Sequence, residues 1–247
     1  MGRLRWFNGV IGLAHFVQGI LMLWLSTAFS LPVSASFLRF DPAAKRLVPT
    51  PETLFDLRIG PLVAAFLFMS ALAHFLIAAP GIYNWYVRNL NRGINYARWI
   101  EYAFSASVMI VAIAMLVGIY DIASLVLTFA LNAMMMLFGL IMELHNQTTE
   151  KTNWTSFWFG VIAGAVPWVA IAIYLIGAGS GVPSFVYWIY VSIFLFFNSF
   201  AINMVLQYKK VGPWREYLYG ERAYIVLSLV AKSALAWQVF AGTLRPA

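Results

Sequence analysis

No charged residue occurs between residues 153 and 208 of this chain. A soluble protein needs charged side chains on its exposed surface, and so long an uncharged run cannot supply such a surface. The whole chain of 247 residues has the same bias, because 62% of its residues are hydrophobic and only 10% are charged. The sequence therefore predicts a membrane protein and excludes a soluble enzyme. The lack of cysteine and the wide spacing of the three histidines exclude disulfides and give no zinc motif.

Hydropathy divides the chain into seven apolar segments, each bounded by charged or turn-forming residues. About 20 residues in a helix cross the hydrocarbon core of a bilayer, and all seven segments reach that length. The first is too long for the roughly 7 to 15 apolar residues of a signal peptide, so it is counted as a helix. We predict an all-α membrane protein, a seven-helix bundle that forms one domain over residues 1–247. The segments are residues 6–29, 57–79, 97–117, 122–142, 155–176, 184–208 and 221–242.

The basic residues are divided unequally between the two sides of this bundle. Cytoplasmic loops of membrane proteins carry an excess of Lys and Arg, and the side of the N-terminus carries ten against five on the other. This predicts a multi-pass protein of the cell membrane with a cytoplasmic N-terminus and, after seven spans, an extracellular C-terminus. The ten are Arg3, Arg5, Arg88, Arg92, Arg98, Lys151, Lys209, Lys210, Arg215 and Arg222, and the five are Arg39, Lys45, Arg46, Arg58 and Arg245.

The longest loop, residues 30–52, is extracellular in this arrangement. It carries Pro32, Pro42, Pro49 and Pro51 with short apolar stretches between them, a pattern that favours a small β-hairpin. The net charge of +7 comes from short loops rather than from one helix face, so we expect membrane lipid and not nucleic acid as the partner of these charges.

Lys232 lies inside the seventh segment, ten residues after Arg222 and thirteen before Arg245. At a rise of about 1.5 Å per residue it is roughly 15 Å from either end, too far for its side chain to reach the membrane surface. A charged amine near the centre of a bilayer is costly and marks a functional site by default. Three interpretations are open: a buried ion pair, a transport-site cation, or a lysine bound covalently to a carbonyl cofactor.

The third segment provides a carboxylate for this lysine. Arg98 and Glu101 are three residues apart and share a helix face, so taken alone they predict an ion pair where the helix begins. Glu101 is nevertheless the one acid that the sequence places clearly within an apolar segment, and a buried cation needs such a partner. The other acids near the segments fall in a turn, at helix ends or at the rim: Asp121, Asp56, Glu216, Glu221 and Glu143.

Seven spans, a single lysine in the last and an Arg-x-x-acid motif at the start of the third resemble a microbial rhodopsin. Two details resemble the heliorhodopsin family in particular, since tyrosine follows Glu101 and Ser228 stands one helical turn before Lys232. Residues 220–247, with the FLFFNSFA run at residues 194–201, also resemble the signature of that family. The cytoplasmic N-terminus agrees, because ordinary rhodopsins have the opposite orientation.

This resemblance implies retinal, all-trans in the dark, bound as a protonated Schiff base to Lys232 with Glu101 as its counterion. It implies a light-absorbing photoreceptor that is not an enzyme. It also implies a homodimer and a downstream signalling partner, which the sequence does not identify.

Further residues would surround the chromophore. By position along their segments, His15 and His74 lie in the cytoplasmic half, level with Glu101. The resemblance places both in a polar cavity by the Schiff base, where either could hold a released proton, whereas His15 taken alone is interpreted as a hydrogen-bonded core residue. Asn132 and Asn198 are interpreted as buried amides that join helices, with Asn132 the better pocket candidate. The other pocket residues that the resemblance implies are Ser228, Tyr102, Ser105, Met135, Trp168 and Phe197.

Three functions stay open: a light sensor, a light-driven ion pump or channel, and a transporter or scaffold that needs no retinal. Ala112 disfavours a pump, because it stands in the third segment where proton pumps commonly hold a carboxylate donor, and no second acid is placed along an exit path. The transporter is disfavoured because the sequence shows no inverted repeat and no matching pair of broken helices. We therefore predict sensing without net transport.

Overall fold

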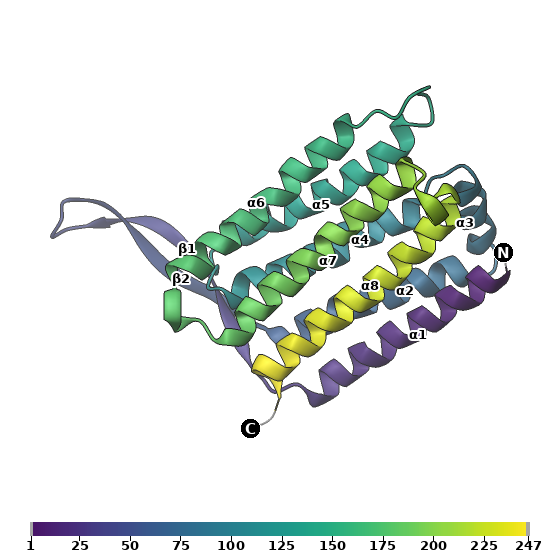
Figure 1. Ribbon diagram of the computed structural model, residues 1–247. Helices are drawn as coiled ribbons and strands as arrows, with labels where there is room; N and C mark the ends of the chain where they lie inside the picture. Colours follow the sequence, from purple (N-terminus) through teal and green to yellow (C-terminus); the bar gives the residue numbers. More distant parts are fainter. Residues whose placement is uncertain (1, 246–247) are drawn as a thin grey trace.

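The computed structural model describes residues 2–245, which form a bundle of long helices with a hairpin at one end (Figure 1). Within these residues, seven helices are long and apolar enough to cross a membrane. The predicted seven-helix bundle is therefore confirmed. Its helices are α1 (Gly2–Leu25), α2 (Ile59–Ala78), α4 (Tyr96–Leu116), α5 (Ile122–His145), α6 (Thr155–Gly177), α7 (Ser184–Tyr208) and α8 (Tyr217–Val239).

Several helices extend beyond the apolar segments that predicted them. α5 continues to His145 and α8 begins at Tyr217, so Glu143 and Glu221 lie within helical turns rather than at a rim or an end. A helix satisfies its own backbone hydrogen bonds, and it continues to do so where its side chains become polar. α8 ends in a π-helical turn, Phe240–Leu244.

The connection between α1 and α2 is the predicted β-hairpin, with β1 (Ser30–Asp41) antiparallel to β2 (Arg46–Arg58). It is longer than the predicted loop, which ended at residue 52, because β2 continues directly to the start of α2. Residues 57 and 58, predicted as the start of the second span, are strand. Both strands are edge strands, which is where prolines are tolerated in a sheet.

The base of the hairpin is fixed to the bundle. The backbone N–H of Ser34 donates to the carbonyl oxygen of Tyr120 at 2.9 Å, and Ser34 also pairs with Asp121. The Asp121 carboxylate caps α5 by accepting from the backbone N–H of Ser124 at 2.9 Å. The far part of the hairpin extends away from the bundle past the end of α6 (Figure 1).

A short helix that hydropathy did not predict, α3 (Ile82–Asn91), follows α2 at the end of the bundle that holds the N-terminus (Figure 1). It is too short and too polar to register as a span. Gly81 precedes it with φ of 84°, in the left-handed region that favours glycine. Two short 3-10 turns, η1 (Gly179–Gly181) and η2 (Gly212–Arg215), connect α6 to α7 and α7 to α8.

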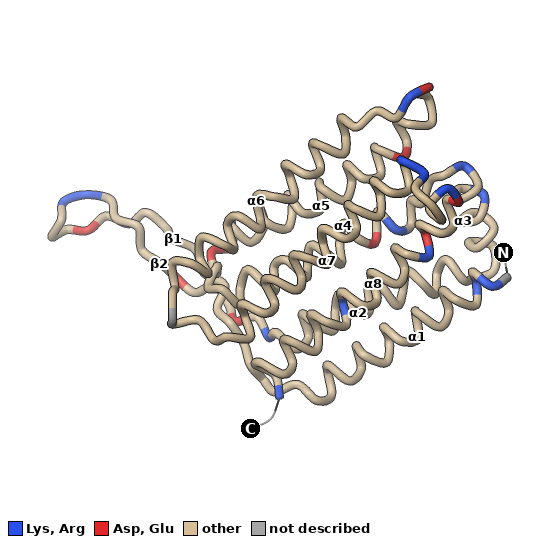
Figure 2. The backbone as a smooth tube through the Cα atoms, viewed as in Figure 1, with Lys and Arg blue, Asp and Glu red and all other residues tan. Residues whose placement is uncertain are grey.

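α4 is the central helix, in contact with α2, α5, α6 and α7. Gly139 of α5 permits a close approach, because a Cβ atom there would lie 2.3 Å from the ring of Trp99 on α4. Charged residues gather at the two ends of the bundle and in the hairpin (Figure 2). α4 can therefore hold polar side chains in the interior, where lipid does not reach them.

Candidate functional site

Lys232 of α8 is buried inside the bundle, with 3% of its side chain exposed. Its Nζ donates to Ser70 Oγ at 2.5 Å, Glu101 Oε1 at 2.7 Å and Ser228 Oγ at 3.1 Å. An ammonium group has three N–H donors and no acceptor, so all three donors are used. The pairing of Lys232 with Glu101 that the sequence predicted is present in the structure. We call these four residues the Lys232 cluster.

Three helices bring the cluster together. Ser228 lies one turn before Lys232 on α8, Glu101 comes from α4 and Ser70 comes from α2. The Ser70 hydroxyl also donates to Glu101 Oε1 at 2.6 Å. A buried pair of opposite charges is tolerated when further hydrogen bonds satisfy it, and the two serines supply them here.

Ser70 is a site residue that the sequence does not predict. A serine in an apolar helix gives no distinctive signal, because it also serves in helix packing. Its one pointer is His74, which follows one turn later and so lies on the same face of α2.

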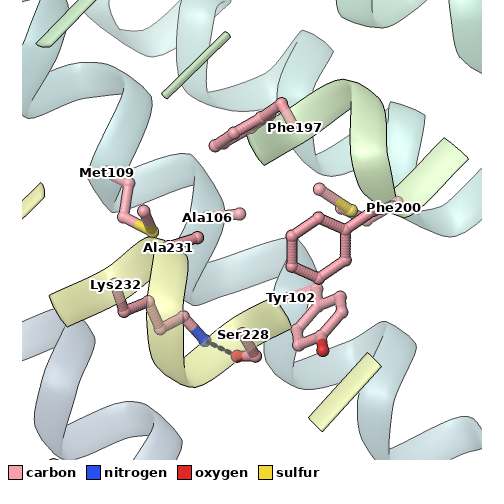
Figure 3. A pocket seen from close by; sticks show the side chains of 9 residues that line it. Tyr102, Ala106, Met109, Phe197, Phe200, Ser228, Ala231 and Lys232 are labelled. Atoms are coloured by element: carbon pink, nitrogen blue, oxygen red, sulfur yellow. Dashed lines mark hydrogen bonds between the residues drawn. The ribbon is translucent and has the colours of Figure 1, made fainter. Parts of the chain in front are cut away.

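A cavity of about 30 Å³ borders Lys232 between α4, α5, α7 and α8 (Figure 3). In Figure 3 the Lys232 amine points toward Ser228, and the rings of Tyr102, Phe197 and Phe200 lie on the facing helices. Except for the amine and two hydroxyl groups, the walls are apolar. They are formed by Tyr102, Ala106, Met109, Met136, Phe197, Phe200, Ser228, Ala231 and Lys232.

A second cavity, of about 90 Å³, shares the walls Met136, Phe197 and Phe200 and extends toward α6. Met135 lines this second cavity, and its Sδ atom fills the space beside Gly164 of α6. Together the two cavities form an apolar path that leads from Lys232 toward the first turns of α6, on the side of the bundle that holds the N-terminus.

The other predicted pocket residues lie at different distances from the lysine. The Tyr102 ring centroid is 5.1 Å from Lys232 Nζ, and its hydroxyl donates to the carbonyl oxygen of Tyr224 at 3.0 Å. Ser105 is buried one turn beyond Glu101. Trp168 packs edge-on against Phe197, with ring centroids 5.4 Å apart, and so supports the wall from behind.

The two asparagines differ from each other. Asn132 is buried and its Nδ2 donates to Ser107 Oγ at 3.0 Å, which joins α5 to α4, and it lines neither cavity. The prediction that Asn198 is buried was wrong. Asn198 is exposed and donates to the carbonyl oxygen of Phe194 in its own helix at 2.8 Å. An amide can face lipid when it bonds back to the preceding turn in this way.

His15 of α1 and His74 of α2 lie side by side, with ring centroids 5.8 Å apart and an angle of 12° between the rings. His74 Nδ1 is 2.8 Å from Asn8 Oδ1. Both ring nitrogens of His15 are buried and make no hydrogen bond to any residue that the structure describes. The two rings thus form a polar pair in the interior.

Arg98 does not pair with Glu101, the pairing that the motif predicts when taken alone. Its guanidinium pairs instead with Glu143 of α5 and Glu221 of α8, and all three residues are buried. Glu101 is therefore not the one acid within the spans. The correction follows from the lengths of α5 and α8, whose last and first turns bring these acids against α4. We call these three residues the Arg98 cluster.

The Arg98 cluster is extensively hydrogen-bonded. Asn95 donates to Glu143 through its backbone N–H at 2.8 Å and to Glu221 through Nδ2 at 2.6 Å. Trp99 Nε1 donates to Glu143 Oε2 at 2.8 Å. These bonds hold the two carboxylates on either side of the guanidinium.

A polar cavity of about 30 Å³ lies between the two clusters and is lined by His74, Glu101, Arg98 and Glu221 among others. That volume is enough for a water molecule. Polar groups therefore extend from Lys232 toward the end of the bundle that holds the N-terminus.

Among the described residues, the other half of the interior holds no buried charged side chain, and its polar groups include the hydrogen-bonded pair Asn132 and Ser107. From the level of Lys232 toward the hairpin, the core includes Val63, Ile110, Ile113, Leu235 and Val239. Ala112 is fully buried there and offers no carboxylate. The charged side chains that the structure describes near the lysine are thus confined to one side of it.

A multi-pass membrane protein with a buried lysine in its last helix, paired to a carboxylate of the third span, has the architecture of a microbial rhodopsin. A family model of heliorhodopsins matches residues 4–244. The chain therefore belongs to the heliorhodopsin family, a photoreceptor-type and non-enzymatic family whose chromophore is retinal. No curated protein matches the chain.

Proposed function

We propose that this protein is a light sensor in which all-trans retinal is bound to Lys232, Glu101 is the counterion, and no net ion transport occurs. When bound, retinal supplies absorption of visible light and a change of shape on isomerisation. The observation that carries the proposal is the one-sided distribution of charged groups around Lys232.

The residues around Lys232 suit this chromophore. A primary amine at one end of an apolar path matches an aldehyde attached to a polyene. An imine nitrogen carries one proton where the ammonium carries three, and Glu101 is the one charged acceptor among the three oxygens at Lys232. The two cavities are smaller than a polyene, but their walls include Met109 and Met136, whose flexible side chains can make room.

Net transport requires a proton to leave on one side of the lysine and to be replaced from the other. His74, Glu101 and the Arg98 cluster all lie on the side of the N-terminus, and the apolar core lies on the other side. Contrary to the expectation from the sequence that no second acid lines an exit path, Glu143 and Glu221 are further buried acids, but they lie on the same side of Lys232 as Glu101. A proton that leaves Lys232 therefore returns by the route it took.

Illumination of the reconstituted protein in sealed vesicles tests this proposal. We expect a transient loss of the visible band as the proton leaves, with no steady, uncoupler-sensitive change in pH under continuous light. A sustained pH gradient or a photocurrent that persists through illumination would favour a pump or a channel instead. A protein that stays colourless with added retinal would favour a transporter or scaffold.

We further propose that the N-terminus is cytoplasmic, on the basis of the ten-to-five division of basic residues. A protease added outside intact cells should then remove an epitope placed after residue 247 and spare one placed before residue 1. The reverse pattern would put Glu101 on the outer side of the lysine.

The protein is also proposed to form a homodimer, to which the exposed face of the hairpin would contribute. Phe40 pairs with Leu47 and Leu38 with Pro49, which places these side chains on one face of the two strands. Leu38, Phe40 and Leu47 are 59 to 65% exposed. Phe40→Glu should lower the dimer fraction in detergent, measured by light scattering, more than Arg46→Glu on the opposite face.

A further inference from the structure

A larger hollow than the three interior cavities lies on the outside of the bundle. It is an apolar groove of about 420 Å³ between α2, α3 and α4, with walls that include Leu72, Leu76, Ile100 and Phe104. Leu72, Ile100 and Phe104 are at least half exposed, so the groove opens on the side of the bundle that faces lipid. A groove of this kind in a membrane protein accepts an aliphatic chain.

Glu101 forms part of this groove as well as part of the Lys232 cluster. It is the one charged residue among the groove-lining residues. Lys232 and Ser70 both bond to its Oε1 atom, and 9% of the side chain is still exposed. An aliphatic chain in the groove would separate Glu101 from mobile lipid and from any water that enters at the interface.

Two basic residues lie in α3 and at its C-cap, beyond the part of this helix that lines the groove. α3 contributes Ile82 and Trp85 to the groove wall, and Arg88 and Arg92 follow Trp85 by three and seven residues. Residues with this spacing share a helix face. Both arginines are exposed and form no salt bridge with any residue that the structure describes.

The position of α3 suits a membrane interface. It lies at the end of the bundle that holds the N-terminus (Figure 1), and the ring of Trp85 packs against Tyr96 of α4 with ring centroids 6.1 Å apart. Tryptophan is enriched at the level of lipid headgroups, and clustered arginines attract anionic headgroups. The arginines are thus at the level expected for a lipid headgroup, and the apolar groove is at the level expected for its acyl chain.

We propose that the groove between α2, α3 and α4 is a specific site for an anionic phospholipid, with its phosphate on Arg88 and Arg92 and one acyl chain covering Glu101. The occupant is a lipid rather than free phosphate, because the apolar groove reaches from Ile82 and Trp85, on the helix that carries Arg88, to the carboxylate of Glu101. This site does not depend on retinal being bound to Lys232.

Native mass spectrometry of the purified protein, reconstituted with phosphatidylglycerol or phosphatidylcholine, tests the site. The protein should retain phosphatidylglycerol preferentially. Arg88→Gln with Arg92→Gln should weaken that retention about fivefold for each arginine, or roughly 25-fold together. Lys151→Gln with Lys209→Gln removes the same charge from the same side away from the groove and should leave retention unchanged.

Leu72→Trp tests the acyl chain, because the larger ring would fill the groove. It should reduce retention of phosphatidylglycerol, whereas Leu127→Trp, at an equally exposed position on α5, should not.

Equal retention of the two lipids by the unmodified protein would overturn the proposal. So would an equal loss of phosphatidylglycerol retention in the double arginine variant and in the double lysine variant. Displacement of the lipid by millimolar inorganic phosphate would assign the arginines to a free anion and would also overturn it. The exposed arginines keep the test valid if Leu72→Trp does not fold.

Discussion

The two buried ion clusters, one around Lys232 and one around Arg98, use opposite charges in different ways. The amine of Lys232 faces one carboxylate and two hydroxyls beside a cavity, whereas Arg98 is enclosed by two carboxylates and the donors of Asn95 and Trp99. A lysine amine can react with an aldehyde and release a proton. A guanidinium does neither in a protein. A buried ion pair can therefore take part in a reaction only if its cation is reactive and if there is space beside it for a second reactant.

The largest expected effect is the loss of retinal binding when Lys232 is replaced. Lys232→Arg keeps the positive charge but cannot form an imine, so the protein should fold and stay colourless after addition of retinal. Arg98→Lys places a second amine in the other cluster, away from the apolar cavity, and should stay pigmented. Absorption spectra and circular dichroism check both variants, and a pigmented Lys232→Arg would contradict the attachment site.

The next effect concerns stability. Arg98→Gln leaves Glu143 and Glu221 buried without their cation, which should lower the free energy of unfolding by about 3 to 5 kcal/mol. Arg39 and Glu52 form an exposed pair in the hairpin, so Arg39→Gln should cost no more than about 1 kcal/mol. Denaturation in mixed micelles measures the difference. An equal decrease in the free energy of unfolding in the two variants would show that the Arg98 cluster does not stabilise the fold more than an exposed ion pair does.

A smaller effect is a shift of the visible absorption maximum, which should distinguish Glu101 from Glu143. Glu101→Gln should shift the visible absorption to the red, because the positive charge at the Lys232 nitrogen is then less stabilised in the ground state. Ser228→Ala should shift it much less, and Glu143→Gln should leave it nearly unchanged because its charge is paired with Arg98. An unchanged spectrum in Glu101→Gln would transfer the counterion role to another group.

The smallest effect is kinetic. Replacing both His15 and His74 with asparagine should change the rate at which the proton leaves or returns, measured by flash photolysis, while retinal binding is retained. His145→Asn, at an exposed position at the end of α5, is the control. Identical kinetics in all three proteins would remove the histidines from the proton route.

The features that could be predicted are those that show in the local sequence pattern, without knowledge of which helices are in contact. Lys232 and Glu101 stand out because each is a charge within an apolar segment. Ser70, Glu143 and Glu221 could not be found in this way, because their surroundings depend on which helix ends meet in three dimensions. Hydropathy also placed residues 57 and 58 in the second span, since β2 runs directly into α2 without a turn that would mark the boundary in the sequence.

Arg98 and Glu101 lie on one face of α4, three residues and about 4.5 Å apart along its axis. Arg98 ties α4 to α5 and α8, and Glu101 ties it to α8 through Lys232. A rotation of α4 that withdraws Glu101 from the lysine must also turn Arg98 against two fixed carboxylates. A displacement of Glu101 at the reactive centre therefore also loads the ion pairs of the Arg98 cluster, closer to the end of the bundle that holds the N-terminus.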